Sequence, residues 1–213
     1  NVDLIISDVL MPLLNGYELC NKIKNNPELC HIPFIILSAK GLDENLIEGY
    51  SQGADIYLNK PFNPELLLTI VNNIFVNLER KQKLISGERQ RNKDKAQKKE
   101  FEVLNPLDEK FFKKLHNYID EHIADSNLNV LVLGKELGFS RTGFYRKIKA
   151  LTGHSPNDYL RIYRLNKAAD LIIEGGYSIS EICDKTGFGT HSYFSNSFKK
   201  HFGISPKNYP ANK

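Results

Sequence analysis

The chain has 213 residues and a formal net charge of +4 at pH 7, with 29 Lys and Arg against 25 Asp and Glu. This length allows one large domain or two small ones, and a hydrophobic fraction of 41% excludes a wholly disordered chain. No apolar run reaches the roughly 18 residues of a transmembrane helix, and no signal peptide is recognisable. The chain begins with Asn1 rather than Met, which indicates a fragment or a processed protein.

The cysteine content indicates a reducing compartment. Cys20, Cys30 and Cys183 are too few and too scattered for a disulfide framework or a zinc site. We therefore expect each to be a small, buried, apolar side chain in a cytoplasmic protein.

Charge is unevenly distributed along the chain. Residues 1–78 carry a net charge of −5, residues 79–106 of +4 and residues 107–213 of +5. This split predicts two units with different partners, joined by a basic linker at 79–106. The linker is nearly free of large apolar residues and cannot fold alone. We favour a solvated linker, and the alternative is a basic arm that contacts DNA phosphates.

Residues 1–78 alternate between short apolar runs and helical patterns. The runs at 4–8, 33–38 and 55–60 contain β-branched residues and predict strands. The segments 17–25, 45–52 and 66–78 have apolar residues three to four positions apart and predict helices. This alternation predicts an α/β unit with a parallel sheet, in which ligands bind at the carboxyl ends of the strands.

A polar residue stands at the end of each predicted strand. Asp8 ends the first strand, Ser38 the second and Lys60 the third. An aspartate can accept a phosphoryl group as a nucleophile, while a hydroxyl and an ammonium group can bind the added phosphate oxygens. Singly, each residue is typical of a strand end that faces water. Three in succession favour a shared site.

The segments around these strand ends resemble the receiver domain of response regulators. They are, in order, Asp8-Val9-Leu10-Met11-Pro12, Asn15-Gly16-Tyr17-Glu18-Leu19, Ser38-Ala39-Lys40, Gly53-Ala54-Asp55-Ile56-Tyr57-Leu58 and Lys60-Pro61-Phe62. The resemblance implies that Asp8 is the phosphoacceptor and Ser38 the switch hydroxyl. It also implies that Tyr57 is the switch aromatic, for which a plain packed ring is the alternative, and that Lys60 is the matching lysine. The Lys60–Pro61 bond is a candidate cis peptide.

The position of the phosphoacceptor departs from this family. Receiver domains have a strand with an acidic pair, a helix and a second strand before it, and a βαβ unit takes about 30 residues or more. We therefore expect a partial, flavodoxin-like receiver without those elements and with an uncovered sheet edge. The missing acids would complete a Mg²⁺ site with Asp8 and the Leu10 backbone carbonyl. Hence we expect Mg²⁺ in an intact receiver, no cofactor in this chain, and weak or no phosphorylation of the isolated chain.

The second half of the chain contains an internal repeat. Each copy reads as a helix, a tight turn at Gly, a second helix and a Gly-x-Ser-Pro stop, which is typical of a helix-turn-helix motif. Phe144, Lys149, Gly153, Ser155, Pro156 and Tyr159 recur fifty positions later as Phe194, Lys199, Gly203, Ser205, Pro206 and Tyr209.

Periodicity predicts the helices of this half. The segments are 111–123, 130–137, 142–151, 156–174, 179–185 and 191–202, with a last turn at 206–209. Ser140, Ser178 and Thr190 are candidate N-caps. The helix from 156 to 174 would be roughly 28 Å long, so one chain could place two recognition helices in major grooves about 34 Å apart.

Outward-facing residues of the two recognition helices are candidates for DNA contact. Arg146 can bond guanine bidentately and Asn196 can do so with adenine, whereas lysines suit phosphates. A solvated helix face is the alternative for each, and a local cap is a further alternative for His191. The candidates are Arg141, Thr142, Tyr145, Arg146 and Lys149 on the first helix, and Thr190, His191, Ser192, Asn196, Lys199 and Lys200 on the second.

Residues 107–213 resemble the AraC-family DNA-binding domain. The resemblance rests on the 175–183 segment Gly-Gly-Tyr-Ser-Ile-Ser-Glu-Ile-Cys, on Gly187-Phe188, Ser192-Tyr193-Phe194 and Phe198-Lys199-Lys200, and on the 202–206 segment Phe-Gly-Ile-Ser-Pro. It implies a seven-helix, double helix-turn-helix domain with base contacts from both recognition helices. Asn196 stands where some members have Arg. The whole chain is thus expected to be α/β plus all-α: partial receiver 1–78, linker 79–106 and DNA-binding domain 107–213.

Our interpretation is a sequence-specific transcription regulator of a two-component phosphorelay, not itself an enzyme, and controlled in its parent by phosphorylation of Asp8. Expected partners are double-stranded DNA, a histidine kinase as phosphodonor and a second copy of the parent, without a small-molecule substrate. The domain order resembles the C-terminal end of hybrid regulators, in which a kinase precedes both domains and an upstream sensor can anchor the parent to a membrane. A shorter response regulator with the same domain order is an equal alternative. The alternatives are a phosphotransfer enzyme and a phosphorylation-incompetent fragment that competes for dimerisation or DNA.

Overall fold

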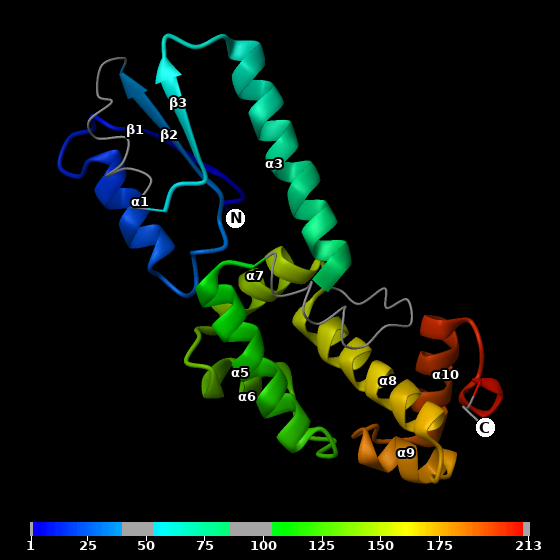
Figure 1. Cartoon of the computed structure of the whole chain (residues 1–213). Helices are drawn as coiled ribbons and strands as arrows, with labels where there is room; N and C mark the ends of the chain where they lie inside the picture. Colours follow the sequence, from blue (N-terminus) through cyan, green and yellow to red (C-terminus); the bar gives the residue numbers. More distant parts are fainter. Residues whose placement is uncertain (1, 40–52, 86–103, 211–213) are drawn as a thin grey trace. The chain divides into compact units, whose positions relative to one another are not determined.

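The computed structural model describes residues 2–39, 53–85 and 104–210 (Figure 1). The predicted helix at 45–52 and most of the basic linker lie outside these residues. The chain forms two compact units. The first contains Asn1–Phe111 and Thr142–Gly153, and the second contains Phe112–Arg141 and His154–Lys213. These units do not coincide with the predicted domains, because residues 142–153 of the predicted DNA-binding domain belong to the first unit. The domain boundaries 1–78, 79–106 and 107–213 therefore remain a prediction.

The first unit is built on a parallel three-stranded sheet, as predicted. Strands β1 (Ile5–Asp8), β2 (Phe34–Ala39) and β3 (Ile56–Lys60) lie in the order β1-β2-β3. In register, Asp8 is opposite Leu37, and Lys60 is opposite Ala39. The carboxyl ends of all three strands therefore lie at the same edge of the sheet.

Helix α1 (Gly16–Lys24) packs on β2. Its N-terminus is held by a capping box, in which the Asn15 side chain accepts from the Glu18 backbone N–H and the Glu18 carboxylate accepts from the Asn15 backbone N–H. A Cβ at Gly16 would lie 2.2 Å from the backbone oxygen of Asp8, so only glycine allows this close approach. The core beneath the helix consists of Val9, Cys20, Phe34 and Ile36.

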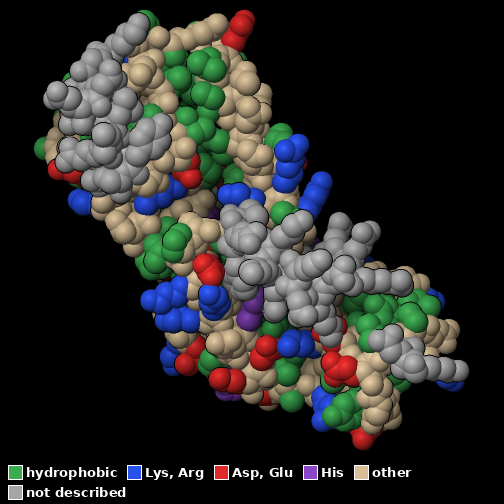
Figure 2. Space-filling model, viewed as in Figure 1, with side chains coloured by type: hydrophobic (Ala, Val, Ile, Leu, Met, Phe, Trp, Pro, Cys, Tyr) green, Lys and Arg blue, Asp and Glu red, His purple; other side chains and the backbone are tan. Residues whose placement is uncertain are grey.

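Helix α3 (Pro64–Ile85) is seven residues longer at its C-terminal end than the predicted helix, and it extends into the predicted linker. Near that end, the Gln82 side chain donates a hydrogen bond of 2.7 Å to the backbone oxygen of Ala150. Hydrophobic side chains gather alongside α3 on the face shown in Figure 2. The exposed apolar residues of this helix are Leu66, Leu68, Phe75, Val76 and Leu84.

The helices of the second half match the predicted segments closely. They are α5 (Pro106–His122), α6 (Val130–Glu136), α7 (Arg141–Thr152), α8 (Pro156–Glu174), α9 (Ile179–Lys185) and α10 (His191–Phe202), followed by a 3-10 turn at Pro206–Asn208. Only α5 begins clearly earlier than predicted. The α/β plus all-α fold class is therefore confirmed.

Local signals explain these boundaries. The side chains of Ser155, Ser178 and Thr190 cap the backbone N–H groups at the starts of α8, α9 and α10. Gly175 and Gly203 follow the ends of α8 and α10 with φ of 74°, a conformation that L side chains rarely adopt. The candidate caps Ser178 and Thr190 are thereby confirmed.

An aromatic core holds the second unit together. Phe194 and Phe198 on α10 are fully buried, with ring centroids 5.7 Å apart in an edge-to-face arrangement. The ring of Phe198 also contacts those of Phe202 and Tyr209. Residues from α8 and α9 complete this core: Leu165, Ala168, Ala169, Ile172, Ile182 and Cys183.

Cys20, Cys30 and Cys183 are all free and buried, as predicted, but Cys30 contacts Asp108 and Lys147 and so does not have the apolar surroundings expected for it. Burial raises the pKa of the Cys20 thiol to about 11, an effect that the nearby Lys24 charge partly opposes. Within the described ranges, no helix combines the length and the apolar character needed to cross a membrane.

Replacing Phe198 with Ala is expected to destabilise the second unit by about 3–5 kcal/mol, because it removes a fully buried ring and leaves a cavity. Urea unfolding followed by circular dichroism measures the change. Lys200→Ala, on the exposed side of the same helix, is the control and should shift stability by less than about 0.5 kcal/mol. Equal effects of the two changes would contradict the assigned core.

Candidate functional sites

The carboxyl edge of the sheet brings two of the predicted site residues into contact. Asp8 at the end of β1 and Lys60 at the end of β3 form an ion pair between the Asp8 Oδ2 and the Lys60 Nζ. Both side chains are about two-fifths exposed, at 40% and 41%. The pair is therefore partly accessible to solvent. The Lys60–Pro61 peptide bond is cis, as the sequence suggested.

This surrounding keeps Asp8 ionised. The pKa of its carboxyl lies below the ordinary value, chiefly because the Lys60 side chain donates a hydrogen bond to it. Desolvation opposes the shift, while the Lys60 charge and the backbone N–H groups of Val9 and Leu10 add to it. An ionised carboxylate is the form that can attack phosphorus.

Ser38 and Tyr57 lie on the neighbouring strands with their own partners. The Ser38 side chain is buried, and its hydroxyl donates a hydrogen bond of 2.5 Å to the Asn59 Oδ1. Sequence reasoning did not single out Asn59, which lies opposite Ser38 in the β2–β3 register. Tyr57 is half-buried against the core of the first unit, with its ring centroid 6.5 Å from that of Tyr17. The switch roles of Ser38 and Tyr57 remain predictions.

The described residues offer few ligands for Mg²⁺. The Asp8 carboxylate and the Leu10 backbone carbonyl are oxygen donors of the right kind, but Mg²⁺ requires a nearly octahedral set of oxygens. In residues 2–39, 53–85 and 104–210, no group of three His, Cys, Asp or Glu side chains could hold a metal ion. One Asp8 oxygen is also engaged by Lys60. These residues alone therefore do not fit a magnesium site.

Helix α7 presents a polar face and an apolar face, as predicted for the first recognition helix. Phe144 and Ile148 are fully buried, while the Lys149 side chain donates a hydrogen bond to the Gly153 backbone oxygen at 2.5 Å. The candidate contact residues are all exposed: Arg141, Thr142, Tyr145, Arg146 and Lys149.

Helix α10 repeats this arrangement. Thr190 and His191 have local partners, because the Thr190 hydroxyl accepts from the Tyr193 backbone N–H and the His191 Nε2 lies 2.8 Å from the Ser180 hydroxyl. The latter contact links α10 to α9. All of its candidate contact residues are exposed: Thr190, His191, Ser192, Asn196, Lys199 and Lys200.

Lys147 on α7 is buried, although lysine side chains are usually exposed. Lys147 has a side chain that is 0% exposed, and it is paired with Asp108, which is 3% exposed. Lysine is rarely buried unless it is paired. Its place in the sequence, beside the inward-facing Ile148, is the one signal that could have indicated burial. The Asp108 partner lies 39 positions away and is not recognisable from the sequence.

Comparisons with known families agree with this geometry. Residues 1–72 match the response regulator receiver domain family. Residues 133–212 match a helix-turn-helix domain family. The two matched segments cover the sheet edge with Asp8 and the two recognition helices, respectively.

Individual relatives match the chain in whole or in part. The histidine kinase P4 of Formosa agariphila is 35% identical over 206 residues, which are 97% of this chain and 15% of that protein. The probable transcriptional regulator ycf29 of Pyropia yezoensis is 55% identical over 74 residues, 35% of this chain and 33% of that protein. A solved C-terminal domain of the response regulator yesN from Fusobacterium nucleatum is 31% identical, covers 47% of this chain and 96% of that one, and has a TM-score of 0.43. The chain thus spans a third or less of the length of these two curated relatives.

Replacing Lys60 with Met is expected to raise the pKa of Asp8, because the hydrogen bond and the charge that lower it are both lost. In the unchanged chain, the interaction stabilises the fold above the ordinary pKa of Asp8, and this stabilisation disappears as pH falls through the lowered pKa. Carboxyl ¹³C NMR titration measures the pKa. Lys24→Met, which removes the partner of Asp55, is the control. The control should leave the pKa of Asp8 unchanged. A pKa of Asp8 that stays equally low in Lys60→Met would contradict the assignment.

Proposed function

Since the chain joins a response regulator receiver segment to an AraC-type helix-turn-helix domain, we propose that it is the DNA-binding part of a two-component transcription regulator. The observation that carries this proposal is the repeated recognition helix. In both copies, buried aromatic residues hold the helix while polar and basic residues face outward. A helix with such a face is what the major groove of B-DNA admits.

The two faces divide into base-reading and phosphate-binding residues. Arg146 and Asn196 are exposed and carry the side chains that bond guanine and adenine bidentately. Lys149 and Lys199 at the ends of the helices supply charge to phosphates, which strengthens binding without reading sequence. The net charge of +5 over residues 107–213 favours a polyanionic partner in the same way.

Asp8 is proposed as the residue through which DNA binding is controlled. It lies ionised and accessible at the carboxyl edge of a parallel sheet, beside an ammonium group that can bind the added phosphate. A phosphorylated Asp8 would lose its present hydrogen bond to Lys60. Ser38 would then turn from Asn59 toward the phosphate, and Tyr57 would move inward, as a population shift between two arrangements.

The phosphoryl donor is proposed to be a histidine kinase, either a separate protein or part of the same polypeptide. The second possibility is supported by the Formosa agariphila relative, which is named a histidine kinase and matches 97% of this chain within a much longer protein. Within the longer protein, Asp8 would accept and hold the phosphoryl group, and this segment would not catalyse a reaction of its own. Mg²⁺ at Asp8 would need oxygen ligands beyond those of the described residues. Dimerisation in the longer protein is part of the same proposal.

DNA binding is tested by selecting a preferred duplex from a random pool and measuring affinity at several salt concentrations. Affinity should fall steeply with salt, because the lysines and arginines release counterions from DNA phosphates. Arg146→Ala should weaken binding to the preferred duplex by about 1–3 kcal/mol, and Arg146→Lys should lose most of the base discrimination while keeping the charge. Lys22→Ala, on the exposed side of α1 and outside both the basic linker and the DNA-binding domain, removes the same charge and is the control. A flat salt dependence, or no preferred sequence, would overturn the proposal.

Control by phosphorylation is tested in the longer protein that contains this chain. Asp8→Asn is expected to abolish the response of a reporter gene to the kinase, because an amide cannot form the acyl phosphate, and to leave DNA binding measurable. Asp3→Asn removes an exposed carboxylate five positions away and should respond normally. A full response from the Asp8→Asn protein would exclude Asp8 as the phosphoacceptor.

A further inference from the structure

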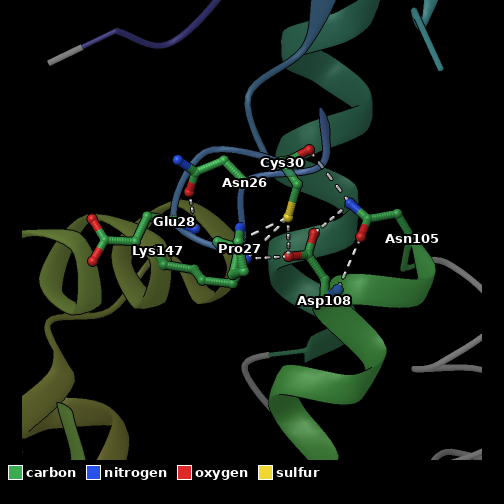
Figure 3. A network of polar contacts seen from close by, with 7 residues as sticks. All are labelled: Asn26, Pro27, Glu28, Cys30, Asn105, Asp108 and Lys147. Atoms are coloured by element: carbon green, nitrogen blue, oxygen red, sulfur yellow. Dashed lines mark hydrogen bonds and ion pairs between the residues drawn. The ribbon is translucent and has the colours of Figure 1, made fainter. Parts of the chain in front are cut away.

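A polar network attaches one side of α7 to the loop that follows α1 (Figure 3). The Lys147 ammonium is paired with the Asp108 carboxylate and lies 3.3 Å from the Cys30 sulfur. The Cys30 thiol in turn lies 3.4 Å from the Asp108 Oδ1, while the Asn105 side chain donates to the Asp108 Oδ2 at 2.7 Å. All of these residues belong to the first unit. The charged groups of this network are shielded from solvent, because the side chains of Lys147 and Asp108 are 0% and 3% exposed.

The loop that closes the network has a defined shape of its own. The Asn26 side chain accepts a hydrogen bond of 2.8 Å from the Glu28 backbone N–H. The backbone oxygen of Cys30 accepts from the Asn105 side chain at 3.5 Å. We call residues 26–30 the covering loop, because Cys30 is the part of it that shields the Lys147–Asp108 pair.

Glu28 of the covering loop lies directly on α7. A Cβ placed at Gly143 would be 2.1 Å from the Glu28 carboxyl group, so the carboxylate occupies the space that a side chain at Gly143 would fill. Gly143 is in the first turn of α7, where the helix dipole favours a negative charge. A DNA phosphate is attracted to the same place for the same reason.

Gly143 and Lys147 form one flank of α7, next to its exposed polar face. They are four residues apart, and so one above the other on the helix, and Arg146 adjoins them on the exposed side. An α-helix with side chains is about 10–12 Å across and the major groove is about 12 Å wide. A helix seated in the groove therefore has a phosphate backbone close to each of its flanks. The covering loop and a DNA backbone cannot both occupy the Gly143–Lys147 flank.

We propose that this flank has two alternative occupants, the covering loop and a strand of DNA backbone, and that DNA engages α7 only when the loop leaves. The loop then limits DNA affinity by occupying space and by the negative charge of Glu28. Lys147 keeps its partners on α5, Asp108 and the Phe111 ring, when the loop leaves, so the gain in affinity comes from the vacated space at Gly143 and from the removal of the Glu28 charge. This inference rests on the proposed DNA-binding function. It adds that the covering loop competes with DNA for one side of α7.

The three cysteines report directly on displacement of the loop. Cys30 is the last residue of the covering loop and is 2% exposed where the loop packs on the Lys147–Asp108 pair, whereas Cys20 lies in the sheet core and Cys183 in the core of the second unit. In the chain alone, all three should react slowly with N-ethylmaleimide. With a saturating amount of the duplex selected from the random pool, Cys30 should react at least tenfold faster, as located by mass spectrometry, while Cys20 and Cys183 should stay slow.

Each outcome of this experiment decides something. A DNA complex in which Cys30 stays as protected as Cys20 overturns the inference and leaves the proposed function intact. Failure to form any salt-sensitive complex overturns the proposed function together with the inference. Faster labelling of all three cysteines signals unfolding on DNA and also counts against displacement of the loop alone.

A charge variant gives an independent measurement. Glu28→Gln keeps the size of the side chain but removes the charge that favours docking on α7 and repels phosphate. We expect it to raise affinity for the selected duplex at least threefold more than Glu65→Gln does, since Glu65 is exposed on α3 outside the basic linker and accounts for the general effect of one less negative charge. Equal effects of Glu28→Gln and Glu65→Gln would overturn the inference.

Discussion

The buried ion pair between Lys147 and Asp108 is the interaction on which the first unit depends. A lysine ammonium is costly to remove from water, and it remains charged in an apolar environment only when an opposite charge and hydrogen bonds replace its solvent shell. Here Asp108 supplies the charge, Asn105 holds Asp108, and Cys30 closes the remaining side. This one pair draws the N-terminal turn of α5, the covering loop and helix α7 together. It explains why α7 belongs to the first compact unit.

The same constraint acts on the titratable groups nearby. Burial holds the pKa of His31 at about 4, and the positive charge of Lys147 contributes in the same direction. The charge on Asp108 opposes the shift, and that of Lys24 adds to it. His31 is consequently neutral at physiological pH, which avoids a second positive charge beside Lys147. Desolvation likewise raises the pKa of the Cys30 thiol, so sulfur contributes as a weak neutral partner.

The two recognition helices of the second half each combine a buried apolar face with an exposed polar face. Phe144 on α7 and Phe194 and Phe198 on α10 face inward and are fully buried, which fixes the orientation of the outward residues without using them for packing. The side chains of Ser178 and Thr190 set where α9 and α10 begin. At the sheet edge, too, the backbone arrangement positions the polar residues, because parallel strands bring the ends that carry Asp8 and Lys60 to one place.

The amino-acid sequence by itself determined the described strands and helices and their polar faces, because these follow from local periodicity and from capping residues such as Ser178 and Thr190, whereas it missed the C-terminal end of α3 and the start of α5. It also indicated that Asp8 and Lys60 meet, since strand ends converge in any parallel sheet. Only the tertiary structure decided the burial of Lys147, the hydrogen bond from Ser38 to Asn59 and the seat of Glu28 on Gly143. These depend on which residues far apart in the sequence come into contact. Asp108 and Lys147 are 39 positions apart, and no local pattern in the sequence signals their contact. The spacing of apolar residues indicates which face of a helix is buried. Whether a polar residue at the edge of that face contacts water or an opposite charge depends on the element that packs against it.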